Sequence, residues 1–409
     1  MRSAKPVDDD RGRLGRQLPS RAGPGGVTGT NGPWPAAHIM SLQPRLPQFL
    51  RIALTSMLLV AVAAAGALLH AGLRGAGAPD DGAQLGTATL VFAEFGPNAD
   101  SVYATSIQDP AERTLIRTVQ HAPGWGLNPS VGVVAGKTAY TVLPPEAAPY
   151  RDSPAELWLL NVITAEATRL ARDADLLAAP VLSEDGRMLA YRRTDDSGTQ
   201  AIVQVDLETR ARRVLHSEAS AFGMFPIGFD RSGAVLVARL APSGTDLLRV
   251  VDGAPATLLL HASDEIARDW RVAPGGDSVA FLAPELSRER MVHRVHVVSL
   301  DGSPSAAGAP PADDGEQYAP AWRWDGALAI GAAAAPLVVG TSETVALPAS
   351  SGFDVPLGWS VAGDYLAVRH FDGISSQAPG AETLVVIGNG TRTTVESTRE
   401  LIFLGWTGA

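Results

Sequence analysis

Length, composition and charge already exclude several kinds of protein. The chain has 409 residues, of which 45% are hydrophobic and 6% aromatic, carries a formal net charge of −10 and contains no cysteine. It is therefore long enough to bury a large core. It can form no disulfide, thiolate metal site, cysteine nucleophile or lipid-modified N-terminal cysteine.

The charge is unevenly distributed along the chain. Residues 1–79 carry nine Lys or Arg against three Asp, a balance of about +6, so the remaining residues carry about −16. A strongly acidic domain repels the phosphate backbone of nucleic acids, and the neutralisation of that backbone supplies most of the binding energy. The sequence therefore predicts no nucleic-acid partner.

The first segment, residues 1–48, is predicted to be a disordered, basic, cytoplasmic region. It is rich in Arg, Gly, Pro and Ser and shows no apolar periodicity. Met40 is followed by SLQPRLPQFLR, which has the composition of a short basic leader. We therefore expect translation to begin at Met40.

Residues 49–74 are predicted to be a transmembrane signal anchor. The stretch from Ile52 to Leu73 has 22 residues and no Asp, Glu, Lys or Arg, and as a helix it would reach about 33 Å, enough to cross the hydrocarbon layer. Arg45 and Arg51 flank its N-terminal side, and this basic excess favours a cytoplasmic N-terminus. The predicted location is the cell membrane, single-pass, with the C-terminal domain extracytoplasmic.

Two alternatives to an uncleaved anchor remain. Ala76-Gly77-Ala78 resembles the small-residue site of a cleaved signal peptide, although Pro79 directly after it disfavours cleavage. A buried core helix is the other alternative. Residues 75–86 (GAGAPDDGAQLG) then form a flexible linker.

Residues 87–409 consist of short apolar runs separated by a recurring glycine-centred turn. The runs are rich in Val, Leu, Ile and Thr and are bounded by Gly, Pro, Asp and Ser, as short antiparallel strands are. The turn glycines fall 37 to 50 residues apart and permit the positive φ of a tight hairpin: Gly136, Gly186, Gly233, Gly276, Gly326 and Gly363. Such a period indicates a repeat architecture, in which each unit is buried against its neighbours.

Two irregularities mark individual units. A proline precedes the turn glycine by six or seven residues in most units, but the fifth unit has Asp269-Trp270 instead. The third strand of the fifth unit is not evident, and the third strand of the sixth is placed at Thr344-Val345-Ala346-Leu347.

The two ends of the repeat region indicate how it closes. Leu401 to Trp406 has the pattern of an opening strand, and the first trio of strands, which begins near Leu90, lacks one. Pairing these ends would complete a seventh four-stranded sheet and leave no exposed edge. We therefore predict an all-β, seven-bladed β-propeller over residues 87–409, preceded by one transmembrane helix; six or eight blades are the alternatives.

One unit resembles the repeat of a known family. Pro180 to Leu215 is similar to the repeat of TolB-type bacterial β-propellers, in which Ser-Pro-Asp-Gly lies between an inner strand and an apolar strand. Glu184 replaces the usual proline, and Leu182 stands where tryptophan is common. Trp322 and Trp359 occupy that tryptophan position in later units, and Phe229 fills it in the fourth: the resemblance covers roughly residues 86–409. It implies the fold and an extracytoplasmic setting but no active site, because such propellers serve as interaction platforms, as parts of peptidases and, more rarely, as enzymes.

Motifs for catalysis are mostly missing from the sequence. There is no Gly-x-Ser-x-Gly elbow, phosphate loop or dinucleotide fingerprint. His293 and His296 are three apart on a predicted strand, so they face opposite sides and cannot chelate one ion unless a bulge intervenes. Four other histidines end or follow strands in different units, where a ring could bring them to its axis: His121, His216, His261 and His370.

Two further patterns are interpreted as structural. The acidic turns Asp195-Asp196-Ser197-Gly198 and Asp313-Asp314-Gly315-Glu316 could offer oxygen ligands to calcium, but neither matches a full calcium-loop pattern, so solvated turns are favoured. Trp322 and Trp359 are interpreted as packing between blades rather than as a binding platform. No catalytic, cofactor-binding or metal-ligating residue is predicted, and no cofactor.

The leading functional hypothesis is a non-catalytic, membrane-anchored, extracytoplasmic propeller that binds a protein or another ligand of the bacterial cell envelope. The alternative is a hydrolase or lyase that acts on glycans or lactones at the central channel. Carboxylates and histidines gathered beside a pocket at the axis would favour the enzyme, whereas small apolar residues there would favour the binding scaffold.

Overall fold

The structure is a computed structural model that describes residues 88–148, 150, 153–220, 222–287, 290–301, 315–340, 348–349 and 351–408. The predictions for residues 1–48, 49–74 and 75–86 lie outside these residues, as does the strand predicted at 344–347. In the described ranges there is no helix long and apolar enough to cross a membrane.

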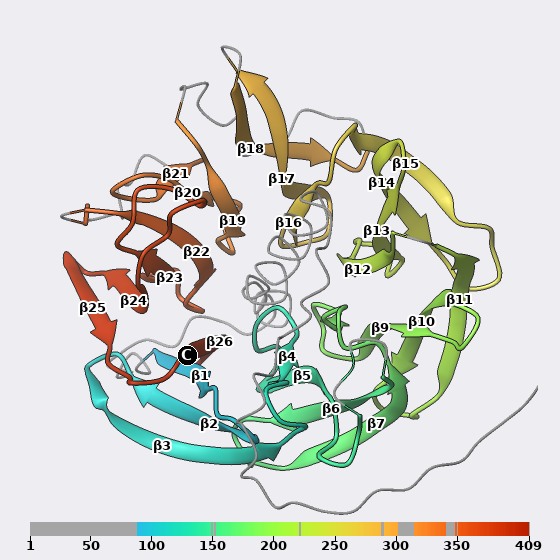
Figure 1. Cartoon of the computed structure of the whole chain (residues 1–409), viewed down its shortest axis with the longest axis horizontal. Helices are drawn as coiled ribbons and strands as arrows, with labels where there is room; N and C mark the ends of the chain where they lie inside the picture. Colours follow the sequence, from blue (N-terminus) through green and yellow to red (C-terminus); the bar gives the residue numbers. More distant parts are fainter. Residues whose placement is uncertain are drawn as a thin grey trace, which may run out of the picture. The chain divides into compact units, whose positions relative to one another are not determined.

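In this part of the chain, 26 strands form seven antiparallel sheets, which stand as blades around a ring (Figure 1). The first four blades, each given from its inner to its outer strand, are β26 (Leu401–Thr407), β1 (Thr89–Glu94), β2 (Ala99–Ser106) and β3 (Asp109–Gln120); β4 (Asn128–Pro129), β5 (Lys137–Val142), β6 (Ala155–Asn161) and β7 (Ala167–Ala174); β8 (Val181–Leu182), β9 (Met188–Thr194), β10 (Thr199–Asp206) and β11 (Arg212–Ala219); and β12 (Met224–Phe229), β13 (Val235–Ala241), β14 (Gly244–Val250) and β15 (Thr257–Ser263).

The fifth and sixth blades have three described strands each, and the seventh has four. They are β16 (Arg268–Val272), β17 (Ser278–Ser287) and β18 (Arg290–Ser299); β19 (Tyr318–Trp322), β20 (Leu328–Gly331) and β21 (Leu337–Val339); and β22 (Phe353–Trp359), β23 (Tyr365–Phe371), β24 (Glu382–Gly388) and β25 (Thr391–Val395).

The ring is closed by the two ends of the repeat region. Strand β26 pairs antiparallel with β1, with Phe403 opposite Phe92 and Gly405 opposite Val91. Blade one therefore takes its inner strand from the end of the chain and its other three strands from the beginning. The prediction of seven blades and of this closure is confirmed.

Each of the seven junctions between neighbouring blades contains a buried apolar cluster. The cluster between blades one and two joins Val91 to Tyr140, and the cluster between blades seven and one joins Val386 to Phe92. The other five junctions are filled in the same way by residues of facing sheets. Each blade is thus stabilised by its two neighbours, as the repeat pattern indicates.

The tryptophans at the repeat position pack between blades, as predicted. Trp322 of blade six donates its indole N–H to the Arg271 carbonyl of blade five at 3.1 Å. Trp359 of blade seven donates likewise to the Ala321 carbonyl of blade six at 3.1 Å. In blade one, Trp406 repeats the bond to Gly358 of blade seven at 2.9 Å.

The six predicted turn glycines all have positive φ, between 66° at Gly186 and 87° at Gly326. They lie in the hairpins that join each inner strand to the second strand of its blade, and these hairpins meet at one end of the ring. This end is called the turn end below.

Candidate functional site

A cavity of about 360 Å³ lies at the turn end, against the inner strands of blades three, four and five. Three segments, each an inner strand with its turn, make most of its wall: residues 181–185, 227–233 and 270–276. Val131 of blade two and Met188 of β9 add to the lining. Three different blades therefore frame one concave site near the axis of the ring.

One inner-strand position next to this cavity is normally small. The carbonyls that accept the tryptophan bonds from the next blade belong to Ala321, Gly358 and Arg271, so these three residues are equivalent. Blade five thus places an arginine side chain where blades six and seven have alanine and glycine. In the cavity lining, Arg271 lies beside Trp270 and Val272.

The side chain of Arg271 is buried, with 4% of its residue surface exposed. Its Nη1 donates to the carbonyl of Trp270 at 2.9 Å, whereas Nε and Nη2 have no hydrogen-bond partner. Burial lowers the pKa of Arg271 to about 10, although the charge of nearby Asp269 acts in the opposite direction.

The backbone beside this arginine is irregular. Asp269 is buried and has a φ of 54°, a left-handed conformation that side chains other than glycine rarely adopt, and the pairing of β16 with β17 shifts between Arg268 and Arg271. Such bulges re-aim side chains and are frequent next to functional sites. The fifth unit's departure from the repeat at Asp269-Trp270 is the sequence counterpart of this bulge.

The acidic residues of the cavity have partners within the chain. Asp230 lies 2.7 Å from Nε of Arg249 and accepts the backbone N–H groups of Ser232 and Ala234. Glu184 of blade three accepts the N–H of Gly275 of blade five at 3.1 Å. These contacts hold the turns of the cavity rim in place.

The histidines singled out in the sequence are not brought together. Each of the six in the described ranges lies instead within ion-pair distance of its own carboxylate, and none is in the cavity lining: His121–Asp100, His216–Glu218, His261–Asp246, His293–Glu316, His296–Glu285 and His370–Asp354. His293 and His296 contact different acids, so the expectation that they do not share a ligand is confirmed.

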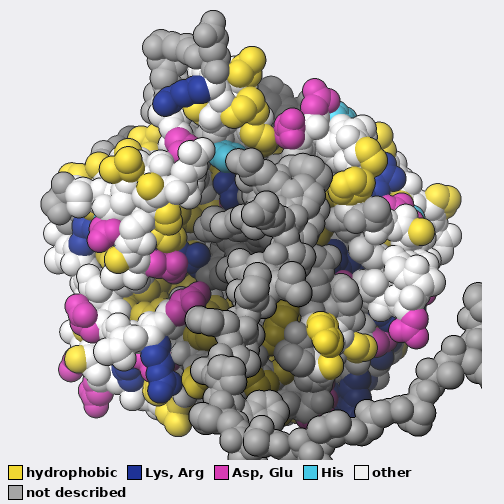
Figure 2. Space-filling model, viewed as in Figure 1, with side chains coloured by type: hydrophobic (Ala, Val, Ile, Leu, Met, Phe, Trp, Pro, Cys, Tyr) yellow, Lys and Arg dark blue, Asp and Glu magenta, His cyan; other side chains and the backbone are white. Residues whose placement is uncertain are grey.

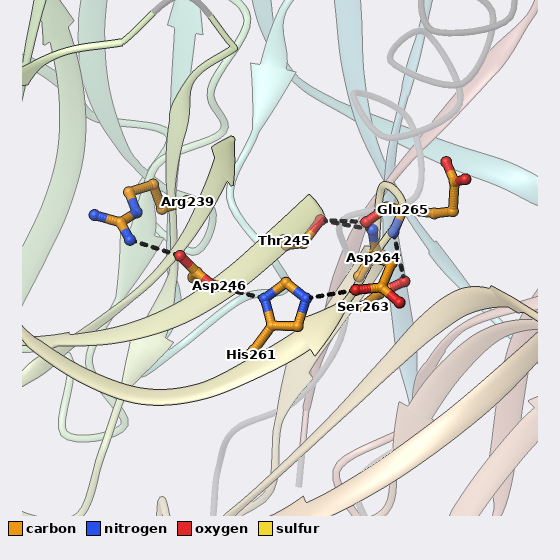
Figure 3. A network of polar contacts seen from close by, with 8 residues as sticks. Arg239, Thr245, Asp246, His261, Ser263, Asp264 and Glu265 are labelled. Carbon is orange, nitrogen blue, oxygen red and sulfur yellow. Dashed lines mark hydrogen bonds and ion pairs between the residues drawn. The ribbon is translucent and has the colours of Figure 1, made fainter. Parts of the chain in front are cut away.

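The polar network around His261 in blade four is drawn in Figure 3. Nδ1 of His261 lies 2.8 Å from Asp246 and Nε2 lies 3.1 Å from Asp264, while Asp246 also pairs with Arg239 at 2.5 Å. Hydrogen bonds to Asp246 and then to Asp264 raise the pKa of His261. Thr245 binds the backbone of Glu265 in the same region. The network fixes the loop after β15, and it contains no nucleophile.

The acidic turns behave as structural turns where they are described. Asp195 accepts the backbone N–H groups of Ser197 and Thr199 at 2.9 and 3.0 Å and so caps its own hairpin. Asp313 and Asp314 lie outside the described residues. Glu316 accepts a hydrogen bond from Ser376 at 2.9 Å in addition to its contact with His293. Among the described residues there is no group of three or more His, Asp or Glu arranged to hold a metal ion.

The surface shows no single-sign patch on the face in Figure 2, where basic and acidic side chains are interspersed over the blades. Arg271 and the cavity were not predicted from the sequence. The available indication was the missing proline of the fifth unit, because a residue that breaks a repeat is a candidate for a role outside it.

Comparisons with known proteins place the fold. No family model matches the chain, and a search of curated sequences finds no match. Among solved structures, TolB from Acinetobacter baumannii matches at 12% identity over 78% of this chain and 66% of that chain, just under two thirds of its length, with a TM-score of 0.44. The β-propeller domain of the Trilobed protease from Pyrococcus furiosus matches at 10% identity over 77% and 93%, with a TM-score of 0.49.

Oligogalacturonate lyase from Vibrio parahaemolyticus is also similar, at 12% identity over 73% of this chain and 91% of that chain, with a TM-score of 0.46. Identities this low concern the fold alone. The chain is a seven-bladed β-propeller, and TolB proteins are among its structural neighbours.

Proposed function

We propose that this chain is a membrane-anchored, extracytoplasmic β-propeller that acts as a binding scaffold in the bacterial cell envelope and holds its ligand at the turn end. The observation that carries the proposal is the cavity framed by blades three, four and five, with the buried Arg271 in its lining. A closed ring keeps these turns in fixed positions, which lowers the entropy lost on binding.

The hydrolase or lyase alternative is not favoured by any contact at this cavity. Its lining contains Glu184, Asp185 and Asp230 but no histidine. Asp230 is paired with Arg249, Glu184 binds Gly275, and Asp185 accepts a hydrogen bond from Ser183 at 2.6 Å. General acid–base catalysis needs a proton-transferring group free to reach a substrate, and these carboxylates are engaged in their own turns.

The membrane anchor is supported by the apolar stretch from Ile52 to Leu73 and its basic N-terminal flank. The test is carbonate extraction of bacterial membranes that contain the full chain, together with protease digestion of spheroplasts. We expect the chain to stay with the membrane and its propeller to be digested from outside. A chain lacking residues 52–73 is the control, and release of the full chain by carbonate would contradict the anchor.

The binding role is tested with a photo-crosslinking amino acid placed at single positions in living cells. Asp185 and Ser232 are exposed residues on the cavity rim, and Thr257 is an exposed residue on the outer strand β15. We expect both rim positions to yield the same crosslinked partner and Thr257 to yield none. Equal crosslinking from Thr257 would contradict a ligand site at the turn end.

A further inference from the structure

We infer that the cavity at the turn end binds an organic carboxylate, with Arg271 as the residue that receives it. The inference rests on the proposed ligand-binding role of the cavity and adds the chemical class of the ligand. It starts from the pattern of used and unused N–H groups on this side chain.

The two unpaired nitrogens of Arg271, Nε and Nη2, lie on the same edge of the guanidinium group, while Nη1 is bound to the Trp270 carbonyl. That edge presents two parallel N–H groups, and their spacing matches the two oxygens of a carboxylate. The bond from Nη1 fixes the orientation of the plane. The side chain is therefore held in advance for two-pronged binding of a planar anion.

No carboxylate of the described residues takes this edge. Arg369, another buried arginine, pairs with Glu382 at 2.8 Å, and Arg192 pairs with Asp175 at 3.0 Å. Asp269 acts on Arg271 through its charge without a hydrogen bond to it. A buried guanidinium with unpaired N–H groups is costly, and an anion bound from outside the chain would satisfy them.

The rest of the cavity narrows the class of anion. Glu184, Asp185 and Asp230 contribute negative charge to the lining, which disfavours a doubly charged group such as phosphate more than a single carboxylate. Val181, Ile227 and Phe229 supply apolar wall for a hydrocarbon body. A volume of about 360 Å³ lies in the range of pockets that bury small organic molecules.

The test is calorimetric titration of the full chain in detergent with benzoate, hexanoate, inorganic phosphate and benzyl alcohol, the last as an uncharged counterpart of benzoate. We expect saturable binding of at least one of the two organic carboxylates and none of benzyl alcohol. Arg271→Met is expected to weaken that binding by about tenfold or more, because hydrogen bonds to a charged group are lost. Arg271→Lys keeps the charge without the paired N–H groups and should fall between the two.

Arg231→Met is the matched control, since it removes the same charge from an exposed residue of the same cavity. It should change the affinity by no more than about twofold. Thermal unfolding checks the fold: Arg271→Met should melt at the same or a higher temperature, because methionine replaces an unpaired buried charge. Its loss of binding then reports the missing guanidinium.

Three results would overturn the inference: no binding of benzoate or hexanoate up to about 10 mM, weaker than which a site has little specificity; equal binding by Arg271→Met; or a preference for phosphate. Failure here is distinguishable from failure of the scaffold proposal. Crosslinks from Asp185 and Ser232 without carboxylate binding would leave the scaffold and remove the subsite. Carboxylate binding without such crosslinks would leave the subsite and remove the larger partner.

Discussion

At the scale of single residues, one indole hydrogen bond is repeated around part of the ring. Trp322, Trp359 and Trp406 each donate to the inner strand of the preceding blade, so three successive junctions contain the same buried contact. Phe229 and Leu182 occupy this position in blades four and three and cannot donate. Those junctions therefore depend on apolar packing alone, and they are the blades that frame the cavity.

His261 gives the chain a pH-dependent contact. Its pKa is raised above the usual 6.5 by hydrogen bonds to Asp246 and then Asp264. A raised pKa in the folded state means that the contact stabilises the fold fully below the pKa of the unfolded state, and that this contribution is lost as the pH rises through the folded value. The imidazolium that binds both aspartates is the form responsible.

We therefore expect His261→Gln to lower the melting temperature more at about pH 5.5 than at about pH 9. The measurement is thermal unfolding of both proteins across this range. Asp264→Asn in the His261→Gln background serves as the control, because it should add little once the histidine is gone. A difference in melting temperature that does not change with pH would rule out this role for His261.

At the scale of elements, the inner strands share a glycine at which the neighbouring blade comes close. Gly228 of β12 and Gly405 of β26 have φ values of 156° and 145°, and both lie at register shifts. A Cβ on Gly405 would lie 2.4 Å from the backbone nitrogen of Val133, whereas on Gly228 it would meet the Val272 side chain at 2.5 Å. The first contact is with backbone, which cannot rotate away.

We expect Gly405→Ala to destabilise the protein by about 1–3 kcal/mol, the range for overpacking a well-filled site, and Gly228→Ala to cost less because a side chain can yield. Urea denaturation of both variants measures this. Gly253→Ala is the control: it has a φ of 72° but nothing within 4 Å of its Cβ, so it reports the backbone contribution alone. A smaller loss in Gly405→Ala than in Gly253→Ala would contradict the close-approach argument.

What the sequence could predict follows from the same distinction between local and distant contacts. Turn glycines such as Gly186 and the apolar strands beside them are local patterns, so the blades and their hairpins were predictable. The closure by Leu401–Trp406 was predictable because one unit lacked a strand that another segment could supply. The cavity depends on turns roughly 45 residues apart meeting in space, and nothing in the neighbourhood of Arg271 announces which N–H groups stay unpaired.

At the scale of the whole molecule, the ring depends on its last strand. Within β26, Ile402, Phe403, Leu404 and Trp406 are at most 7% exposed, and they pack against both blade one and blade seven. Burial of each such side chain contributes about 1.5–3 kcal/mol. Their sum is comparable with the whole stability of a typical protein, about 5–15 kcal/mol.

Deletion of residues 401–409 should therefore abolish cooperative unfolding and expose the edge of β1 to aggregation, which size-exclusion chromatography and urea denaturation would detect. Deletion of residues 408–409 alone should change little, because Gly408 is exposed and follows the strand. A synthetic peptide of residues 400–409 added to the truncated chain should restore the cooperative transition by pairing with β1. If the truncated chain unfolded cooperatively at the urea concentration of the full chain, the pairing of β26 with β1 would not be what closes the ring.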